Sequence, residues 1–141
     1  MLNSFFDSVV YHAATKGMDA AALRQKVIAN NLANVDTPHF KRVEVNFEDA
    51  FKKALEKSPN QLVGFRTDKQ HFPINRNPDF RSVTPTMWRQ NDTYSRSDDN
   101  NVDMDVEMVE LAKNELMMNS LVEIMNRKFK GLSSAIAGRS E

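Results

Sequence analysis

The chain of 141 residues is 40% hydrophobic and 27% charged, which suits one modest domain and is too little for two separate cores. Its 19 basic and 19 acidic residues cancel, so no net charge attracts nucleic acid or an anionic membrane, and none keeps copies of the chain apart. The absence of cysteine excludes disulfides, thiolate metal sites and a cysteine nucleophile.

The first predicted element is a long helix over residues 1–36. Positions spaced by three and four residues from Leu2 to Asn34 are mostly apolar or small, with Lys16 as the one charge. Gly17 is a position at which this helix can bend. The opening stretch LNSFFDSVVYH has no basic segment and no long apolar run, so we expect neither a secretory signal nor a membrane-spanning helix.

The helix is predicted to end in a corner at ANNLANVDTPHFKR, residues 29–42. Thr37 precedes Pro38 and is pushed out of the helical region, so the helix must end near Asn34 to Asp36. Asparagine disfavours a helix interior because its amide competes for backbone groups, but at a helix end that amide can bond the last carbonyl groups. We therefore predict a fixed corner whose amides reach a neighbouring backbone or another chain. Plain helix termination with solvated asparagines is the alternative.

The middle of the chain, residues 37–101, is predicted to be mostly irregular. Apolar and polar residues alternate at 43–47, as in a short strand or an extended linker. A short helix follows in NFEDAFKKALEKSP, with Asn46 as its cap and a stop before Pro59. Over residues 61–101 prolines, polar residues and single aromatics replace any period, which leaves room for a short strand pair but not for a domain.

A second long helix is predicted over residues 102–141. Acidic residues crowd its start and basic residues its end, as the helix dipole favours, and Gly138 suits its stop. Its apolar stripe, interrupted only by Glu115, consists of Met104, Met108, Leu111, Met118, Val122, Met125, Phe129, Leu132 and Ile136. Because both stripes repeat at 3.5 residues, we expect the two helices to pack along their length as a coiled coil.

The predicted fold class is therefore mainly α. Two long terminal helices pack as an antiparallel coiled coil and form one core domain, beside a short middle helix and an irregular central segment that is open to some β structure. More apolar side chains flank the two stripes than one partner helix can cover. These are Phe5, Val10, Ala21, Ile28, Leu32, Val109, Ala112, Leu116, Leu121 and Ile124. We expect further copies or related chains to cover them; an ordinary small helical bundle is the alternative.

The corner motif resembles the asparagine-rich motif near the N-terminus of bacterial flagellar rod and hook proteins. The residues that match it in order are Asn30, Asn31, Leu32, Ala33, Asn34, Thr37, Phe40 and Lys41. The Asp-Thr-Pro turn, the helix after VNFEDAF, the stretch RTDKQHFPI and the C-terminal helix are similar to proximal-rod members in particular. His39 stands where the family usually has glycine, so this turn uses either a positive φ on histidine or another geometry.

The resemblance implies a structural subunit of the hollow, torque-transmitting rod of the flagellar basal body. It implies export through the flagellar type III channel without a signal peptide. The implied partners are copies of the chain, other rod proteins, and the rod-base adaptor with the membrane ring. A free-standing coiled-coil adaptor or export chaperone is the alternative function.

The residues themselves predict no catalytic or metal site, no cofactor, no nucleic acid and no small-molecule substrate. His12, His39 and His71 are isolated from one another and lack the spacing of metal ligands. The acidic run at 103–107 lacks the glycine and closing glutamate of a calcium loop and is better explained as a helix start. An enzyme acting through residues 61–101 would need convergent acid, base or nucleophile groups that the segment does not show.

The predicted assembly interface combines the corner with the second helix. On the corner side it comprises Val27, Asn30, Asn31, Leu32, Asn34, Asp36, Thr37, Pro38 and Phe40. On the second helix it comprises Met108, Leu111, Met118, Val122, Met125 and Phe129. Flexible methionine side chains suit contacts in which identical subunits meet non-identical neighbours.

Overall fold

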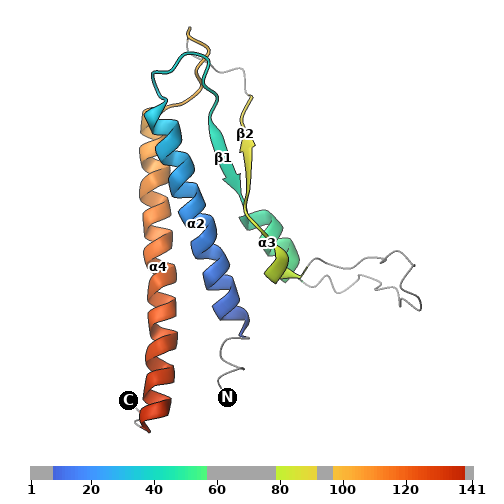
Figure 1. Cartoon of the computed structure of the whole chain (residues 1–141), viewed down its shortest axis with the longest axis vertical. Helices are drawn as coiled ribbons and strands as arrows, with labels where there is room; N and C mark the ends of the chain where they lie inside the picture. Colours follow the sequence, from blue (N-terminus) through green and yellow to red (C-terminus); the bar gives the residue numbers. More distant parts are fainter. Residues whose placement is uncertain (1–7, 57–78, 92–96, 139–141) are drawn as a thin grey trace, which may run out of the picture.

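A computed structural model of the chain describes residues 8–56, 79–91 and 97–138. Two long helices, α2 (Val9–Ala33) and α4 (Met104–Ala137), run antiparallel and side by side (Figure 1). Among the described residues, no helix is long and apolar enough to cross a membrane. The predicted, mainly helical fold with two long helices in contact is confirmed.

The ends of both helices follow local sequence signals. α2 ends with Asn34 as its C-cap, within the range that the Thr-Pro dipeptide predicts. The side chain of Asp103 caps α4 by accepting hydrogen bonds from the N–H groups of Asp105 and Val106. Gly138 ends α4 in the left-handed conformation, with a φ of 65°.

A two-stranded antiparallel sheet lies beside α2. Strand β1 (Val43–Asn46) pairs with β2 (Thr86–Arg89), so that Val43 lies opposite Arg89. The alternation at 43–47 thus forms a strand, but its partner comes from forty residues further along the chain. Short-range patterns cannot predict such a pairing.

The short helix α3 (Glu48–Leu55) follows β1, as predicted, but the cap assignment was wrong. Asn46 is the last residue of β1, and Phe47 occupies the N-cap position without any side-chain hydrogen bond. Phe47 is only 3% exposed, so its burial fixes where the strand ends and the helix starts. Tertiary packing here overrides the local capping preference.

A small apolar core lies on the side of α2 that faces away from α4. It consists of Ala20, Phe47, Ala54 and Val83, against which Phe51 and Phe80 pack. The rings of Phe47 and Phe51 stack with centroids 5.0 Å apart. Phe80 belongs to the 3-10 helix η1 (Phe80–Ser82). α2 therefore lies in the middle of three layers, between α4 and the layer of strands and α3 (Figure 1).

The face of α4 that meets α2 contains only part of the predicted apolar stripe. Its most buried side chains are Glu107 and Asn114, and the Nδ2 group of Asn114 donates to the carbonyl of Ala21 at 3.0 Å. Leu111, Met118 and Met125 of the stripe share this face and are half-buried. Leu132 is half-buried as well, and the remaining members are exposed: Met104, Met108, Val122, Phe129 and Ile136. The expectation that the whole stripe lies in the helix pair is wrong, because the polar side chains of Glu107 and Asn114 occupy the buried positions that were expected for Met108 and Glu115.

Gly17 was expected to bend the first helix, but its role in the structure is to allow close packing between α2 and α4. It lies inside the continuous helix α2, and a Cβ atom built there would come within 3.0 Å of the side chain of Leu121 on α4. The missing side chain therefore lets the two helices approach closely.

We expect Phe47→Ala to lower the free energy of unfolding by about 3–5 kcal/mol, because it empties the centre of the small core. Leu55→Ala in α3 is the matched control: Leu55 is 39% exposed, so its truncation should cost about 1 kcal/mol. Chemical denaturation measures both values. Equal losses in the two variants would show that the core around Phe47 does not hold α3.

Candidate functional site at the asparagine corner

Asn31 ties α2 to both of its neighbouring layers. Its side chain is 1% exposed. Its Oδ1 atom accepts the N–H of Val43 at 3.1 Å, and its Nδ2 group donates to the carbonyl of Val43 at 2.8 Å. The same Nδ2 group donates to Oε2 of Glu107 at 3.2 Å. The amide thus pairs with β1 as the peptide group of an adjacent strand would, and also holds α4.

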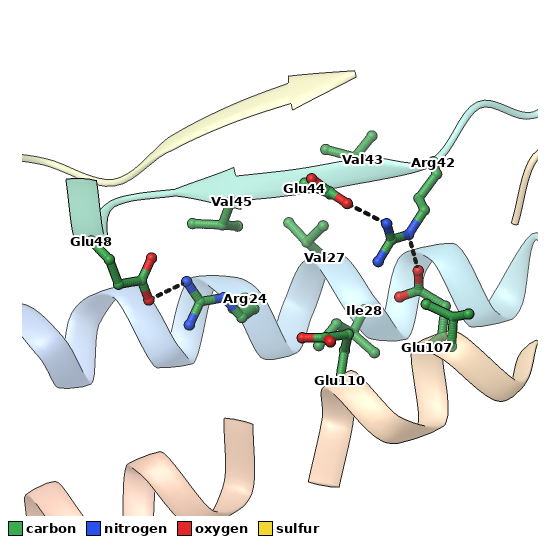
Figure 2. Close-up of a pocket in the computed structure, with 11 residues that line it drawn as sticks. Arg24, Val27, Ile28, Arg42, Val43, Glu44, Val45, Glu48, Glu107 and Glu110 are labelled. Carbon is green, nitrogen blue, oxygen red and sulfur yellow. Dashed lines mark hydrogen bonds and ion pairs between the residues drawn. The ribbon is translucent and has the colours of Figure 1, made fainter. Parts of the chain in front are cut away.

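Arg42 completes this buried polar cluster. Figure 2 shows its guanidinium between Glu44 of β1 and Glu107 of α4, with an ion pair to each. Glu107 is 0% exposed, so its carboxylate depends on Arg42 and Asn31 for partners. Burial lowers the pKa of Arg42, but the hydrogen bond and charge of Glu107 outweigh burial and raise the pKa above its ordinary value. Arg42 therefore stays charged, and its contribution to stability is lost only in strong alkali.

A second pair of asparagines, Asn100 and Asn101, closes the corner from the other side. Asn100 is 0% exposed, and its Nδ2 group lies 2.9 Å from the carbonyl oxygens of Asn34, Val35 and Thr37. These are carbonyl groups that the end of α2 leaves without helical partners. Asn100 was not among the predicted corner residues, although an asparagine pair directly before a helix start is a recognisable pattern.

Asn101 joins the corner to the sheet. Its Oδ1 atom accepts the N–H of Arg42 at 2.7 Å, and its Nδ2 group donates to the carbonyl of Gln90 at 3.0 Å. The N–H of Gln90 donates to the carbonyl of Arg42 at 2.9 Å. The corner and the two strands therefore form one hydrogen-bonded unit.

Two residues in the corner adopt a left-handed backbone conformation without being glycine. His39 and Asp99 both have a φ of 62°. The N–H of His39 donates to the carbonyl of Asp98 at 2.9 Å, and Lys41 Nζ donates to the carbonyl and to Oδ1 of Asp99, each at 2.8 Å. His39 therefore keeps the positive φ that glycine usually supplies at this position of the turn. Hydrogen bonds between the turn and residues 98–99 stabilise that conformation.

The other predicted corner residues divide between structural and exposed positions. Asn34 donates from Nδ2 to the carbonyl of Asn30 at 2.8 Å, as predicted for amides at a helix end. The side chains of Leu32 and Phe40 are half-buried, and Val27 is buried. Those of Asn30, Asp36, Thr37 and Pro38 are exposed. Asn31 forms hydrogen bonds within its own chain, whereas the side chains of the exposed members are accessible.

A groove of about 450 Å³ lies next to the buried cluster, between α2, β1 and the start of α4 (Figure 2). Its apolar lining comes from Val27, Ile28, Val43, Val45 and Val106. Its charged lining comes from Arg24, Arg42, Glu44, Glu48, Glu107 and Glu110. Four carboxylates against two guanidinium groups leave a net charge of −2. Within the residues that the structure describes, no group of three side chains is arranged to hold a metal ion.

Comparisons with known proteins place the corner in a defined family. Residues 12–41, which span most of α2 and the turn after it, match the profile of a family described as "Flagella basal body rod protein". The chain is 36% identical over 121 residues to the flagellar basal body rod protein FlgB of Bacillus subtilis, covering 86% of this chain and 88% of that protein. The chain belongs to the FlgB family of flagellar basal body rod proteins.

Other relatives agree with that assignment to the FlgB family. The FlgB protein of Borreliella burgdorferi is 31% identical over 133 residues, which cover 94% of this chain and 97% of that protein. The FlgB protein of Borrelia hermsii is 33% identical over 124 residues, with 87% and 92% covered. A rod protein is a structural component of the basal body, so the family assigns the chain a structural and non-enzymatic role.

We expect Arg42→Met and Glu107→Met each to cost about 3–5 kcal/mol, because each leaves a buried charge without its main partner. The double variant should cost clearly less than the sum, because it leaves neither charge unpaired. Denaturation of the wild type, the two single variants and the double variant gives the coupling energy. Additive losses would mean that the ion pair does not hold α4 to β1.

The adjacent asparagines offer a second test. Asn31→Asp replaces the Nδ2 donor by an oxygen that faces the carbonyl of Val43 and the carboxylate of Glu107, and we expect a loss of about 3 kcal/mol or more. Asn30→Asp makes the same chemical change at an exposed position and should stay within about 0.5 kcal/mol of the wild type. Thermal and chemical denaturation compare the two. Similar losses would contradict the role given to Asn31.

Proposed function

We propose that this chain is a subunit of the proximal rod, which assembles through its two terminal helices into a hollow, torque-transmitting tube. In this proposal the rod joins the membrane ring through the rod-base adaptor. The neighbours of each subunit are further copies and other rod proteins, and the chain reaches the rod through the flagellar type III channel. In the same proposal residues 1–36 and 102–141 are the two axial helices of one core domain, and residues 37–101 are the turn, short helix and middle segment between them.

The observation that supports the proposal most directly is the exposed apolar surface of α4. Large apolar side chains are exposed along its whole length, from Met104 near the corner to Ile136 near the end of the helix. Leu116 is 70% exposed and Ile136 is 73% exposed. A monomer rarely leaves such a continuous apolar helix uncovered, whereas a subunit that packs against other helices needs it.

The rigid corner supports the same reading. The bonds of Asn31, Asn100 and Arg42 fix the angle between α2, the strands and the start of α4. A subunit that transmits torque must pass force between its axial helices and the strands beside them without bending. A free-standing adaptor or chaperone would not need that stiffness, so the proximal-rod function is favoured over it.

A substitution at Val122 tests whether the exposed apolar stripe of α4 takes part in assembly. In a strain that lacks its own proximal rod subunit, we expect the wild-type chain to restore a basal body with a rod, and Val122→Asp to abolish this. The charge would be buried unpaired where neighbouring helices meet. Electron microscopy of basal bodies and motility in soft agar are the measurements.

Asn119→Asp, one turn away on the same helix and also exposed, should leave the rod intact. Circular dichroism should show unchanged helix content in both purified variants, because neither side chain is buried in the subunit. A rod built normally with Val122→Asp would overturn the use of this stripe in assembly. Failure of the wild-type chain to restore any rod would overturn the proposed function.

A further inference from the structure

Strand β2 leaves the side chains of all its residues, Thr86–Arg89, exposed. Met87 and Trp88 are large and apolar, and they are 60% and 50% exposed. A strand at the edge of a sheet can pair with another chain, and proteins that avoid such pairing place charges or proline on the edge. β2 has one charge, that of Arg89, beside two large apolar side chains. Its composition therefore suits a contact with another surface.

The outer edge of β2 also has unpaired main-chain groups. The N–H of Gln90 donates to the carbonyl of Arg42, so these two residues are a bonded pair of the ladder. Bonded and non-bonded pairs alternate in an antiparallel ladder, and Met87 and Arg89 therefore turn their N–H and carbonyl groups away from β1. In the described part of the chain these groups have no hydrogen-bond partner. The sheet can therefore accept a further strand at β2.

The groove beside the buried cluster follows the other edge of the same sheet. Val43, Glu44 and Val45 all line it. Successive side chains of a strand point to opposite faces, so three consecutive residues line one groove only where the groove follows the edge of the strand. Val45, like Val43, turns its N–H and carbonyl groups away from β2. Asn31 bonds these groups of Val43, whereas those of Val45 have no partner among the described residues.

The groove and β2 are complementary in charge and in apolar character. The lining of the groove combines five apolar side chains with a net charge of −2. Glu110 is its most readily available carboxylate, because its side chain is 36% exposed and its ion pair is with Lys113 of the same helix. β2 brings the guanidinium group of Arg89 and the ring of Trp88. Opposite charges favour this pairing, and tryptophan is a common anchor in the centre of a protein interface.

β2 does not reach the groove of its own subunit. β1 lies between α2 and β2 (Figure 1), and the described residues that line the groove come from α2, α4, β1 and the residues next to β1. A contact between β2 and the groove must therefore join two chains. Each chain has one strand and one groove to contribute. Because α2 and α4 both line the groove, it is complete only in a subunit whose long helices are packed together.

We propose that β2 of one copy docks in the groove of the next copy in the rod, edge to edge with β1. Trp88 then meets the apolar lining, and Arg89 meets the carboxylates. The contact presupposes the proposed function, because it forms between neighbouring copies in an assembled rod. It is head-to-tail and continues from copy to copy. When all subunits point the same way along the rod, β2 of the neighbour runs antiparallel to β1, as β2 of the same chain does.

Cross-linking in isolated basal bodies tests the contact, because the chain has no cysteine of its own. A strain that lacks its own rod subunit expresses Met87→Cys and Val106→Cys as two separate chains, and its basal bodies are treated with a short bismaleimide. Val106 lines the groove and is 44% exposed. We expect covalent dimers when both chains are present and little product from either chain alone, because a head-to-tail contact joins unlike surfaces. Mass spectrometry of the linked peptides identifies the pair.

Met87→Cys together with Asn126→Cys is the matched control for cross-linking. Asn126 is exposed on the same helix as Val106 but lies about 30 Å further along it, so this pair should give little covalent product.

Charge reversal tests the forces in the same strain. Arg89→Glu should reduce the number of basal bodies with a rod at least about tenfold, because it places a carboxylate against a negatively charged groove. Adding Glu110→Arg in the same chain removes the net charge of the groove and should restore rods to within about threefold of the wild type. Lys53→Glu is the matched control, since it makes the same charge change at an exposed position of α3 and should leave rod number unchanged.

The size of the anchor gives an independent measurement. Trp88→Ala should reduce the number of rods at least about tenfold, whereas Trp88→Phe keeps an aromatic ring and should stay within about threefold of the wild type. Trp88 is half exposed within the subunit, so circular dichroism should show the same helix content in both purified variants.

Several results would overturn this contact. Strong dimers from Met87→Cys alone would mean that β2 pairs with a second β2. Rods built from the two cysteine chains without any cross-link between them would also contradict it, as would an Arg89→Glu variant that behaves like Lys53→Glu. In each of these cases the wild-type chain still builds a rod, and the proposed function stands. Failure of the wild-type chain to build any rod would overturn both.

Discussion

The buried amide of Asn31 and the carboxylate of Glu107 are the contacts on which the rest of the structure depends. Through them one position near the end of α2 is bonded to β1 and to α4 at the same time. Removing either group would leave buried polar atoms without partners, which costs more than such bonds gain when they form. A few polar atoms therefore join three layers near the end of α2.

The polar contacts between α2 and α4 determine which apolar side chains of α4 stay exposed. Because Glu107 and Asn114 occupy the buried face of α4, several of its methionine, valine and leucine side chains face outward. A coiled coil closed by its own apolar stripe would have been more stable alone and would have had little left to offer a neighbour. In this chain hydrogen bonds fix the geometry between α2 and α4, and apolar surface of α4 stays exposed.

Local signals in the sequence predicted the elements well. The Thr-Pro dipeptide located the end of α2, Asp103 and Gly138 bounded α4, and the alternation at 43–47 formed a strand. Each of these depends on a few adjacent residues. The seam was mispredicted because hydrophobic periodicity assumes that the buried face is the apolar one. Contacts such as Asn100 with the end of α2 join residues more than sixty positions apart, and no local pattern contains them.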